Sequence, residues 1–264
     1  MIRRLWLIGC GNMAGAMLRQ WLASGTLAAS DVVVVNRTDR DLPDGVLQAR
    51  SLPEGPPPDA VLLAMKPQQI DEVAATHGAR IAGAPLLISI LAGVEEAAIA
   101  RRFSAGAIVR AMTNLPVGIG KGVVALHSAS AGTDTRAAAA ALMAPLGLVE
   151  WVAPELFDAV TALAGSGPGF LYRYIDAMTS AGAALGIPAD QAARLALATV
   201  EGSALLAAAA DVSPAALADR VASPGGSTRK GLDVLDDNAA LVRLLTATLE
   251  ASTARNAEMA AAAR

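Results

Sequence analysis

The sequence predicts an α/β protein, in which a Rossmann-type, doubly wound and mainly parallel sheet is followed by an all-α C-terminal dimerisation domain. Two observations predict this class. Up to residue 152, short apolar runs without polar alternation are separated by helix-like segments, which is typical of parallel strands covered on both faces. After residue 152, long alanine-rich segments of helical character replace these runs.

The first domain, residues 1–152, is expected to alternate between strands and helices. Gly25 would end the first helix, and the breaker-rich stretch 53–59 precedes one of the strands. We expect strands at 4–9, 32–36, 60–65, 85–91, 107–112 and 122–127, and helices at 12–24, 95–103 and 133–147.

The second domain, residues 153–264, is expected to be helical, with helices at 167–186, 188–210, 213–222 and 238–263. Pro188 and Pro214 suit first-turn positions, and Ser213 and Asn238 suit N-caps. Alanine and glycine occur on several faces of these helices and permit close helix approach. So much apolar surface in one segment predicts burial against a second subunit.

Composition excludes several classes of partner. The 264 residues are 54% hydrophobic and carry a net charge of −3. Because this charge is weakly negative, neither nucleic acid nor an anionic membrane is an expected partner. Two arginines followed by an apolar stretch have the order of a short secretion signal, but Gly-Cys-Gly interrupts the stretch and a polar-faced helix follows, so we do not expect secretion. The lone Cys10 can form no internal disulfide, so we expect a cytoplasmic protein, and no metal site is predicted.

The stretch "LIGCGNMAG" predicts a dinucleotide-binding loop. Gly9, Gly11 and Ala14 have the G-x-G-x-x-[G/A] spacing between a strand and a helix. Gly9 permits a tight turn, Gly11 lets a pyrophosphate approach the backbone, and Ala14 lets the helix pack on the sheet. N–H groups at the helix start, near Asn12 and Met13, face the anion. A ligand-free tight turn is the alternative.

The cofactor is predicted to be NADPH, with NADH as the second candidate. Asn36 and Arg37 end the second predicted strand, where an NAD site would carry Asp or Glu. The Arg37 guanidinium can bind a 2′-phosphate and stack on adenine. An ordinary solvated charge is the alternative interpretation of Arg37.

Residues that follow other strands are expected to line the rest of the cofactor crevice, because ligands lie beyond the carboxyl ends of parallel strands. Lys66 and Pro67 either contact the cofactor or form a stiff surface turn. His77 and His127 are expected to be structural or solvated rather than catalytic. The remaining cofactor candidates are Ala64, Ala92, Gly93 and Asn114.

A second glycine turn, "VASPGGSTRKGL", opens a helix in the second domain. Together with "GCGNM", "MKPQQ", "SILAGV" and "ELFDAVTALAGSGPGFLY", it makes nearly the whole chain similar to the pyrroline-5-carboxylate reductase family. The resemblance implies hydride transfer from NADPH to the C=N bond of 1-pyrroline-5-carboxylate, which yields L-proline. It also implies a homodimer through the C-terminal helices, able to assemble further, with the active site between the cofactor domain and those helices.

The second turn is expected to hold the substrate carboxylate, because backbone N–H groups at a helix start bind anions and Gly-Gly allows close approach. A plain helix cap is the alternative. The resemblance implies that Thr228 hydrogen-bonds the ring nitrogen, which makes it the candidate catalytic residue. The substrate-binding candidates are Ser223, Gly225, Gly226, Ser227 and Thr228.

One segment departs from the family pattern. Family members commonly read Met-Pro-Asn-Thr-Pro where this chain reads "MTNLP", so Leu115 removes a hydroxyl near the expected nicotinamide pocket. The departure at Leu115 motivates the first of two further hypotheses that stay open. One is a reductase of another cyclic imine or 2-oxo acid, and the other is a non-catalytic NADPH-binding sensor.

Overall fold

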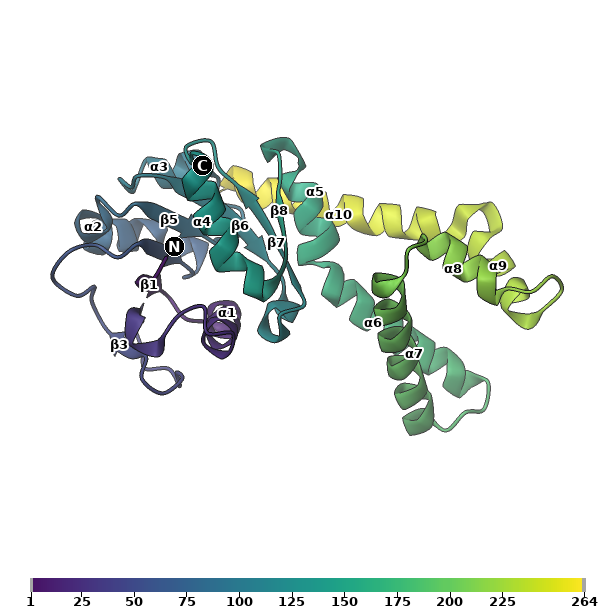
Figure 1. The fold of residues 1–264 in the computed structure, drawn as a ribbon. Coiled ribbons are helices and arrows are strands. Elements are labelled where there is room, and N and C mark those ends of the chain that lie inside the picture. The colour runs from purple at the N-terminus through teal and green to yellow at the C-terminus, as the bar shows by residue number, and fades with distance from the viewer. Residues whose placement is uncertain (1, 263–264) are drawn as a thin grey trace. The chain divides into compact units, whose positions relative to one another are not determined.

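The computed structural model describes residues 2–262 and contains one eight-stranded sheet in the order β3-β2-β1-β4-β5-β6-β7-β8 (Figure 1). All neighbouring strands are parallel except β6 and β7, so β7 and β8 run against the other six. The strands are β1 Leu5–Ile8, β2 Val32–Val35, β3 Leu47–Ala49, β4 Ala60–Leu63, β5 Leu86–Ser89, β6 Ile108–Thr113, β7 Gly122–His127 and β8 Gly147–Trp151. The predicted fold class is confirmed.

Helices cover both faces of this sheet. On one face, Trp21 of α1 is fully buried and its indole N–H donates to the carbonyl of Leu142 in α4 at 2.7 Å. On the other face, Ile81 of α2 and Ile99 of α3 join the apolar side chains of β4 and β5. The helices of this region are α1 Asn12–Ala23, α2 Ile70–Ile81, α3 Glu96–Ala100, α4 Thr133–Met143 and α5 Phe157–Val160. Side chains that alternate along each strand thus enter two separate cores.

The sequence-based prediction missed the two strands at the edges of the sheet, β8 and β3. β3 has only three residues, pairs with β2 alone at the edge of the sheet, and carries the polar Gln48 at its centre. Such a strand has no apolar run to reveal it, since it is stabilised by the neighbouring strand rather than by its own burial.

The chain divides into two compact units. The first comprises residues up to Ser166 together with those from Ala251 onward, and the second is Gly167–Glu250. The last residues of α10 (Ala240–Ala262) belong to the first unit because Asn256 donates to the carbonyl of Asp158 at 3.2 Å, while the hydroxyls of Ser166 and Ser252 lie 3.3 Å apart. The predicted division at residue 152 into a cofactor domain and a substrate domain rests on the change in sequence pattern, and it remains a proposal.

The second unit is helical. Its helices are α6 Gly167–Ala184, α7 Ala189–Ala209, α8 Pro214–Val221, α9 Ser227–Asp236 and the first part of α10. Ser213 is the N-cap of α8 as predicted, since its hydroxyl accepts from the N–H of Ala216 at 3.2 Å. The Asn238 cap was wrong: Asn238 lies in a kink with φ of 49°, where Asn is one of the few residues that tolerates a left-handed backbone. Pro188 precedes α7 instead of lying in its first turn.

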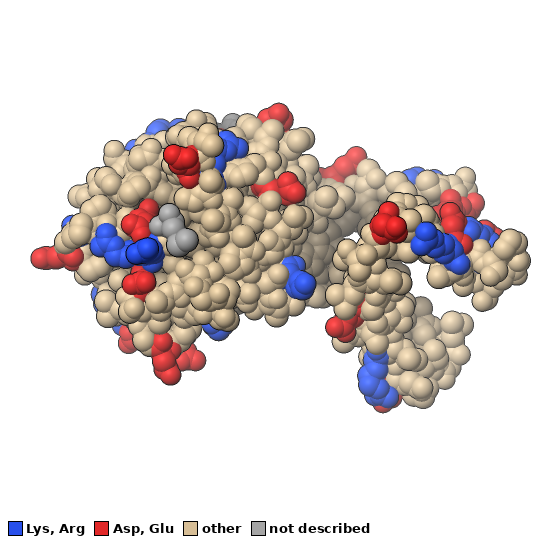
Figure 2. Space-filling model, viewed as in Figure 1, with Lys and Arg blue, Asp and Glu red and all other residues tan. Residues whose placement is uncertain are grey.

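Large apolar side chains are exposed along these helices. α7 is, within residues 2–262, the one helix whose length and composition would also suit a membrane crossing. The exposed fractions of Leu185, Leu206 and Leu244 are 86%, 64% and 65%. On the face shown in Figure 2, basic and acidic residues form small mixed patches instead of one field of a single sign. Apolar surface of this extent is typical of a protein interface.

Candidate functional site

The glycine loop after β1 has the geometry of a dinucleotide-binding turn. Gly9 has φ of 84°, and a Cβ there would lie 2.7 Å from the backbone nitrogen of Met65. Gly11 is the N-cap of α1, no side chain caps that helix, and a Cβ at Gly11 would meet no atom within 4 Å. Gly9 therefore lets the loop approach β4, whereas Gly11 leaves the helix start open to an anion. Ala14 is buried against the sheet, as expected.

Asn36 holds the glycine loop in place through hydrogen bonds of its side chain. Its side-chain oxygen accepts from the N–H of Cys10 at 2.8 Å, and its side-chain nitrogen donates to Gln48 at 3.1 Å. The residue is only 8% exposed. Its carboxamide thus fastens the glycine loop to β3, a role that the sequence pattern did not reveal because β3 was not predicted.

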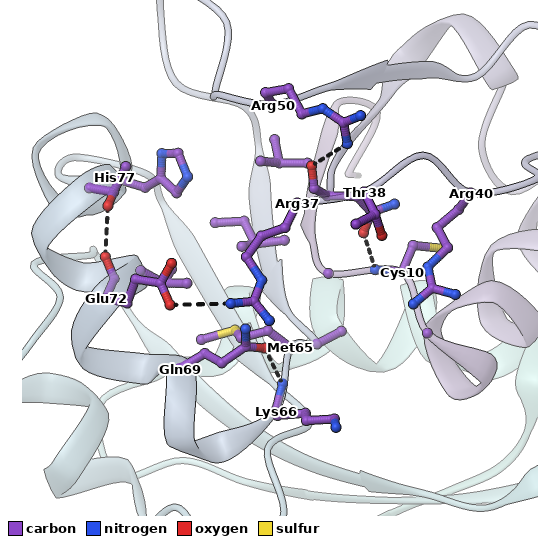
Figure 3. Close-up of a pocket in the computed structure, with 18 residues that line it drawn as sticks. Cys10, Arg37, Thr38, Arg40, Arg50, Met65, Lys66, Gln69, Glu72 and His77 are labelled. Carbon is purple, nitrogen blue, oxygen red and sulfur yellow. Dashed lines mark hydrogen bonds and ion pairs between the residues drawn. The ribbon is translucent and has the colours of Figure 1, made fainter.

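A cavity of about 420 Å³ opens beside the loop at the carboxyl ends of β1, β2 and β4 (Figure 3). Arg37, Arg40 and Arg50 all line it. Arg37 points to Glu72, with 3.6 Å between the guanidinium and the carboxylate, and both side chains are largely exposed. An exposed pair at this distance is weak, so the Arg37 guanidinium can rearrange toward a ligand. Arg40 and Arg50 were missed in the sequence, although Arg40 follows Arg37 by three positions.

The turn after β4 closes the same cavity. Ala64 and Lys66 line it, while Pro67 does not. The side chain of Gln69 accepts from the N–H of Lys66 at 3.2 Å, and Pro67 begins a short 3₁₀ helix. The predicted stiff turn is therefore present, and it brings Lys66 to the cavity wall. Asn12 lies at a smaller hollow on the other side of the glycine loop.

A second cavity, of about 340 Å³, lies at the carboxyl ends of β4, β5 and β6. Of the residues predicted to bind the cofactor, Met13, Ala64, Ala92 and Gly93 line it, whereas Asn114 does not. The last helix of the chain forms part of its wall through Asn256 and Met259. Gly93 has φ of 73°, and a Cβ there would lie 3.1 Å from Met259, so this glycine also permits the helix to pack against the loop.

Arg110 places a positive charge in this second cavity. Its guanidinium lies 3.9 Å from the centre of the Phe157 ring and 4.0 Å from the carboxylate of Asp158. Burial lowers the pKa of Arg110, and the nearby Asp158 opposes that shift. The sequence prediction missed this residue because an arginine inside an apolar strand carries no motif.

The Ser223–Thr228 turn has a defined geometry within the helical unit. The N–H of Gly226 donates to the carbonyl of Ser223 at 2.9 Å, and Gly225 has φ of 72°. Pro followed by a positive-φ Gly is typical of a type II turn. Gly226 is the N-cap of α9 without a side-chain cap, and Arg229 ties α9 to Asp219 of α8 at 2.7 Å.

This turn leaves the first N–H groups of α9 for an anion. Because the Gly226 N–H is used inside the turn, the donors left from the predicted set are those of Gly225, Ser227 and Thr228. Ser223 and Thr228 are exposed.

His77 lines the first cavity, whereas His127 lines neither of the two cavities. Burial lowers the pKa of His77, which lies in α2. His127 contacts the carbonyl of Val152 at 3.1 Å and lies 3.7 Å from Glu96.

The single cysteine, Cys10, is buried, and burial raises the pKa of its thiol. Within residues 2–262, no cluster of potential ligands could hold a metal ion.

A Rossmann-type sheet, an open glycine loop and an arginine-lined cavity define a nicotinamide-dinucleotide-dependent oxidoreductase. Two family models match: one described as pyrroline-5-carboxylate reductase dimerisation over residues 154–259, and one described as NADP oxidoreductase, coenzyme F420-dependent, over residues 4–93.

Individual relatives agree with these matches. A pyrroline-5-carboxylate reductase from Synechocystis sp. is 38% identical over 88% of this chain and 90% of its own. The solved reductase from Coxiella burnetii is 29% identical, has a TM-score of 0.89 and covers 98% of this chain and 99% of its own. A Plasmodium falciparum reductase solved with NADP bound has a TM-score of 0.84 at 21% identity, over 98% of both chains, and supports the fold.

The chain belongs to the pyrroline-5-carboxylate reductase family. The predicted family, oxidoreductase class and nicotinamide cofactor are confirmed.

Proposed function

We propose that this chain reduces 1-pyrroline-5-carboxylate to L-proline with NADPH. The observation that carries the proposal is the presence of two uncapped helix starts that follow glycine turns, one in each compact unit. Two anions need binding in this reaction, namely the cofactor pyrophosphate and the substrate carboxylate. Backbone N–H groups at a helix start suit both.

In this proposal NADPH, when bound, supplies the hydride that attacks the C=N carbon of the ring. The N–H groups of Gly225, Ser227 and Thr228 bind the carboxylate, with Ser223 adding a hydroxyl. The Thr228 hydroxyl hydrogen-bonds the ring nitrogen, which carries a proton in the secondary amine product. Because a cyclic imine can take that proton from water, the chain contributes mainly by orientation.

Assembly and location are part of the same proposal. The exposed leucines of the helical unit would be covered by the same helices of a second copy, giving a homodimer that can associate further. A dimerisation model matches this part of the chain. We propose that the enzyme acts in the cytoplasm, with residues 1–152 binding the cofactor and residues 153–264 binding substrate and partner.

The proposal is tested by measuring NADPH and NADH oxidation with 1-pyrroline-5-carboxylate as the acceptor. Turnover with preference for NADPH is the expected result. Leu115 is 55% exposed beside the end of β6, so the assay includes larger and smaller cyclic imines and open-chain 2-oxo acids. A faster rate with one of these would favour the alternative reductase. Tight NADPH binding without turnover on any acceptor would favour the sensor.

The cofactor preference depends on Arg37. Replacing Arg37 by Ala is expected to lower kcat/KM for NADPH by ~10- to 100-fold, because a charge-assisted hydrogen bond contributes ~1.5–3 kcal/mol. The rate with NADH serves as the internal control and should change little. Equal losses with both cofactors would assign Arg37 to stacking on adenine rather than to the 2′-phosphate.

A further inference from the structure

Asn114 uses both ends of its carboxamide inside the protein. It follows β6 directly and is 6% exposed. Its side-chain oxygen accepts from the N–H of Val123 at 2.8 Å, and its side-chain nitrogen donates to the carbonyl of Ala164 at 2.9 Å. If the amide were flipped, its NH2 group would face the N–H of Val123 and its oxygen would face the carbonyl of Ala164. Neither pair can form a hydrogen bond, so only one orientation of the amide fits. One N–H and one oxygen lone pair of the carboxamide remain unused, but the side chain is buried and Asn114 lines neither of the two cavities, so it is not directed at a cofactor.

The carbonyl of Ala164 needs a donor for a reason visible in the sequence. In an α-helix it would accept from the N–H four residues further on, but that residue is Pro168, which has none. The chain forms a π-helix at Thr161–Gly165, where the N–H of Ser166 donates to the carbonyl of Thr161 at 3.0 Å. Asn114 therefore replaces the donor that Pro168 lacks.

The π-helix forms part of the second cavity. Thr161 and Gly165 line it, as do Met112 and Thr113 of β6. A Cβ on Gly165 would lie 3.1 Å from the sulfur of Met112, so this turn packs closely on the strand. The hydrogen bond from Asn114 to Ala164 holds β6 and the π-helix together, and it thereby sets the width of the cavity at the end of the sheet.

We propose that Asn114 is a positioning residue for hydride transfer and not a ligand of the cofactor. This inference rests on the proposed function, because it assigns the second cavity to the nicotinamide end. Loss of the Asn114 donor shifts the π-helix, and hence the wall against which the reacting ring lies. Misplacement by about 1 Å can cost ~100-fold in rate, whereas the adenine side of the cofactor keeps its contacts.

The test is a double-mutant cycle between Asn114 and Pro168. Pro168→Ala provides an N–H four residues after Ala164, so that carbonyl can accept a helical hydrogen bond again. Asn114→Asp keeps an acceptor for Val123 and removes the donor to Ala164. We expect Asn114→Asp to lower kcat by ~10- to 100-fold with the Kd for NADPH within about twofold of wild type. The loss should be several-fold smaller in the Pro168→Ala background.

Two outcomes would overturn the proposal. An equal loss of kcat in both backgrounds would show that the two residues are not coupled. A raised Kd for NADPH at unchanged kcat would show that Asn114 contacts the cofactor. The same cycle is also measured without turnover, from the thermal unfolding midpoints of wild type, the two single variants and the double variant in the absence of cofactor. Absence of wild-type turnover would count against the proposed function alone, while coupled midpoints would still support the link between Asn114 and Pro168.

Discussion

Replacing Gly9 by Ala is expected to abolish tight NADPH binding and to destabilise the fold by ~3 kcal/mol or more. Two costs combine at this position. A left-handed backbone, here with φ of 84°, costs a residue with a Cβ ~1–2 kcal/mol. The new Cβ would also lie 2.7 Å from the nitrogen and 2.8 Å from the Cα of Met65, and backbone atoms cannot move aside as a flexible side chain could.

Two matched variants separate the cost of the left-handed backbone and the loss of NADPH binding from the clash with Met65. Gly25 has φ of 68° but open space around its Cβ position, so Gly25→Ala should show the backbone cost alone, ~1 kcal/mol. Gly11 has ordinary φ and open space, so Gly11→Ala should leave the thermal midpoint unchanged while raising the Kd for NADPH. Thermal denaturation and cofactor fluorescence measure both quantities. A Gly9→Ala protein with wild-type stability would contradict the close packing of the loop on β4.

Replacing Thr228 by Ala is expected to lower kcat/KM for 1-pyrroline-5-carboxylate by ~100-fold, because a hydroxyl that bonds the reacting nitrogen acts directly on the transition state. Thr228 is exposed near the start of α9, and its side chain forms no hydrogen bond with another of residues 2–262. The substitution should therefore leave the thermal midpoint within a degree or two of wild type. Steady-state kinetics at saturating NADPH provide the measurement.

Two further variants test whether the loss of activity comes from the Thr228 hydroxyl itself. Thr228→Ser retains it and should keep most of the activity. Ser227→Ala removes a hydroxyl from the adjacent position and should raise KM at most modestly, since the backbone N–H of residue 227 remains. Full activity in Thr228→Ala would remove this residue from the mechanism.

The glycine loop was predictable because its chemistry is local. Gly9 and Gly11 are required by the turn itself, and the strand before them and the helix after them are visible in the same short stretch. The Ser223–Thr228 turn was predictable for the same reason, since proline and glycine at fixed positions define it.

The roles of Asn36 and Asn114 were not predictable from their positions. Asn36 ends a strand and lines the first cavity, but its support of the glycine loop through Gln48 was hidden because Gln48 lies on an edge strand without an apolar run. Asn114 bonds a carbonyl 50 positions away, and the need for that bond arises from a proline. Long-range hydrogen bonds of this kind leave no period or spacing in the sequence.

The return of the final helix to the first unit affects how the protein is made. Asn256 and Met259 form part of the wall of the second cavity, although the strands that form its floor end at residue 113. During synthesis the sheet can form early, but that wall is absent until the last helix has left the ribosome. A nascent or truncated chain that ends before residue 251 would therefore keep the first cavity but lack part of the wall of the second.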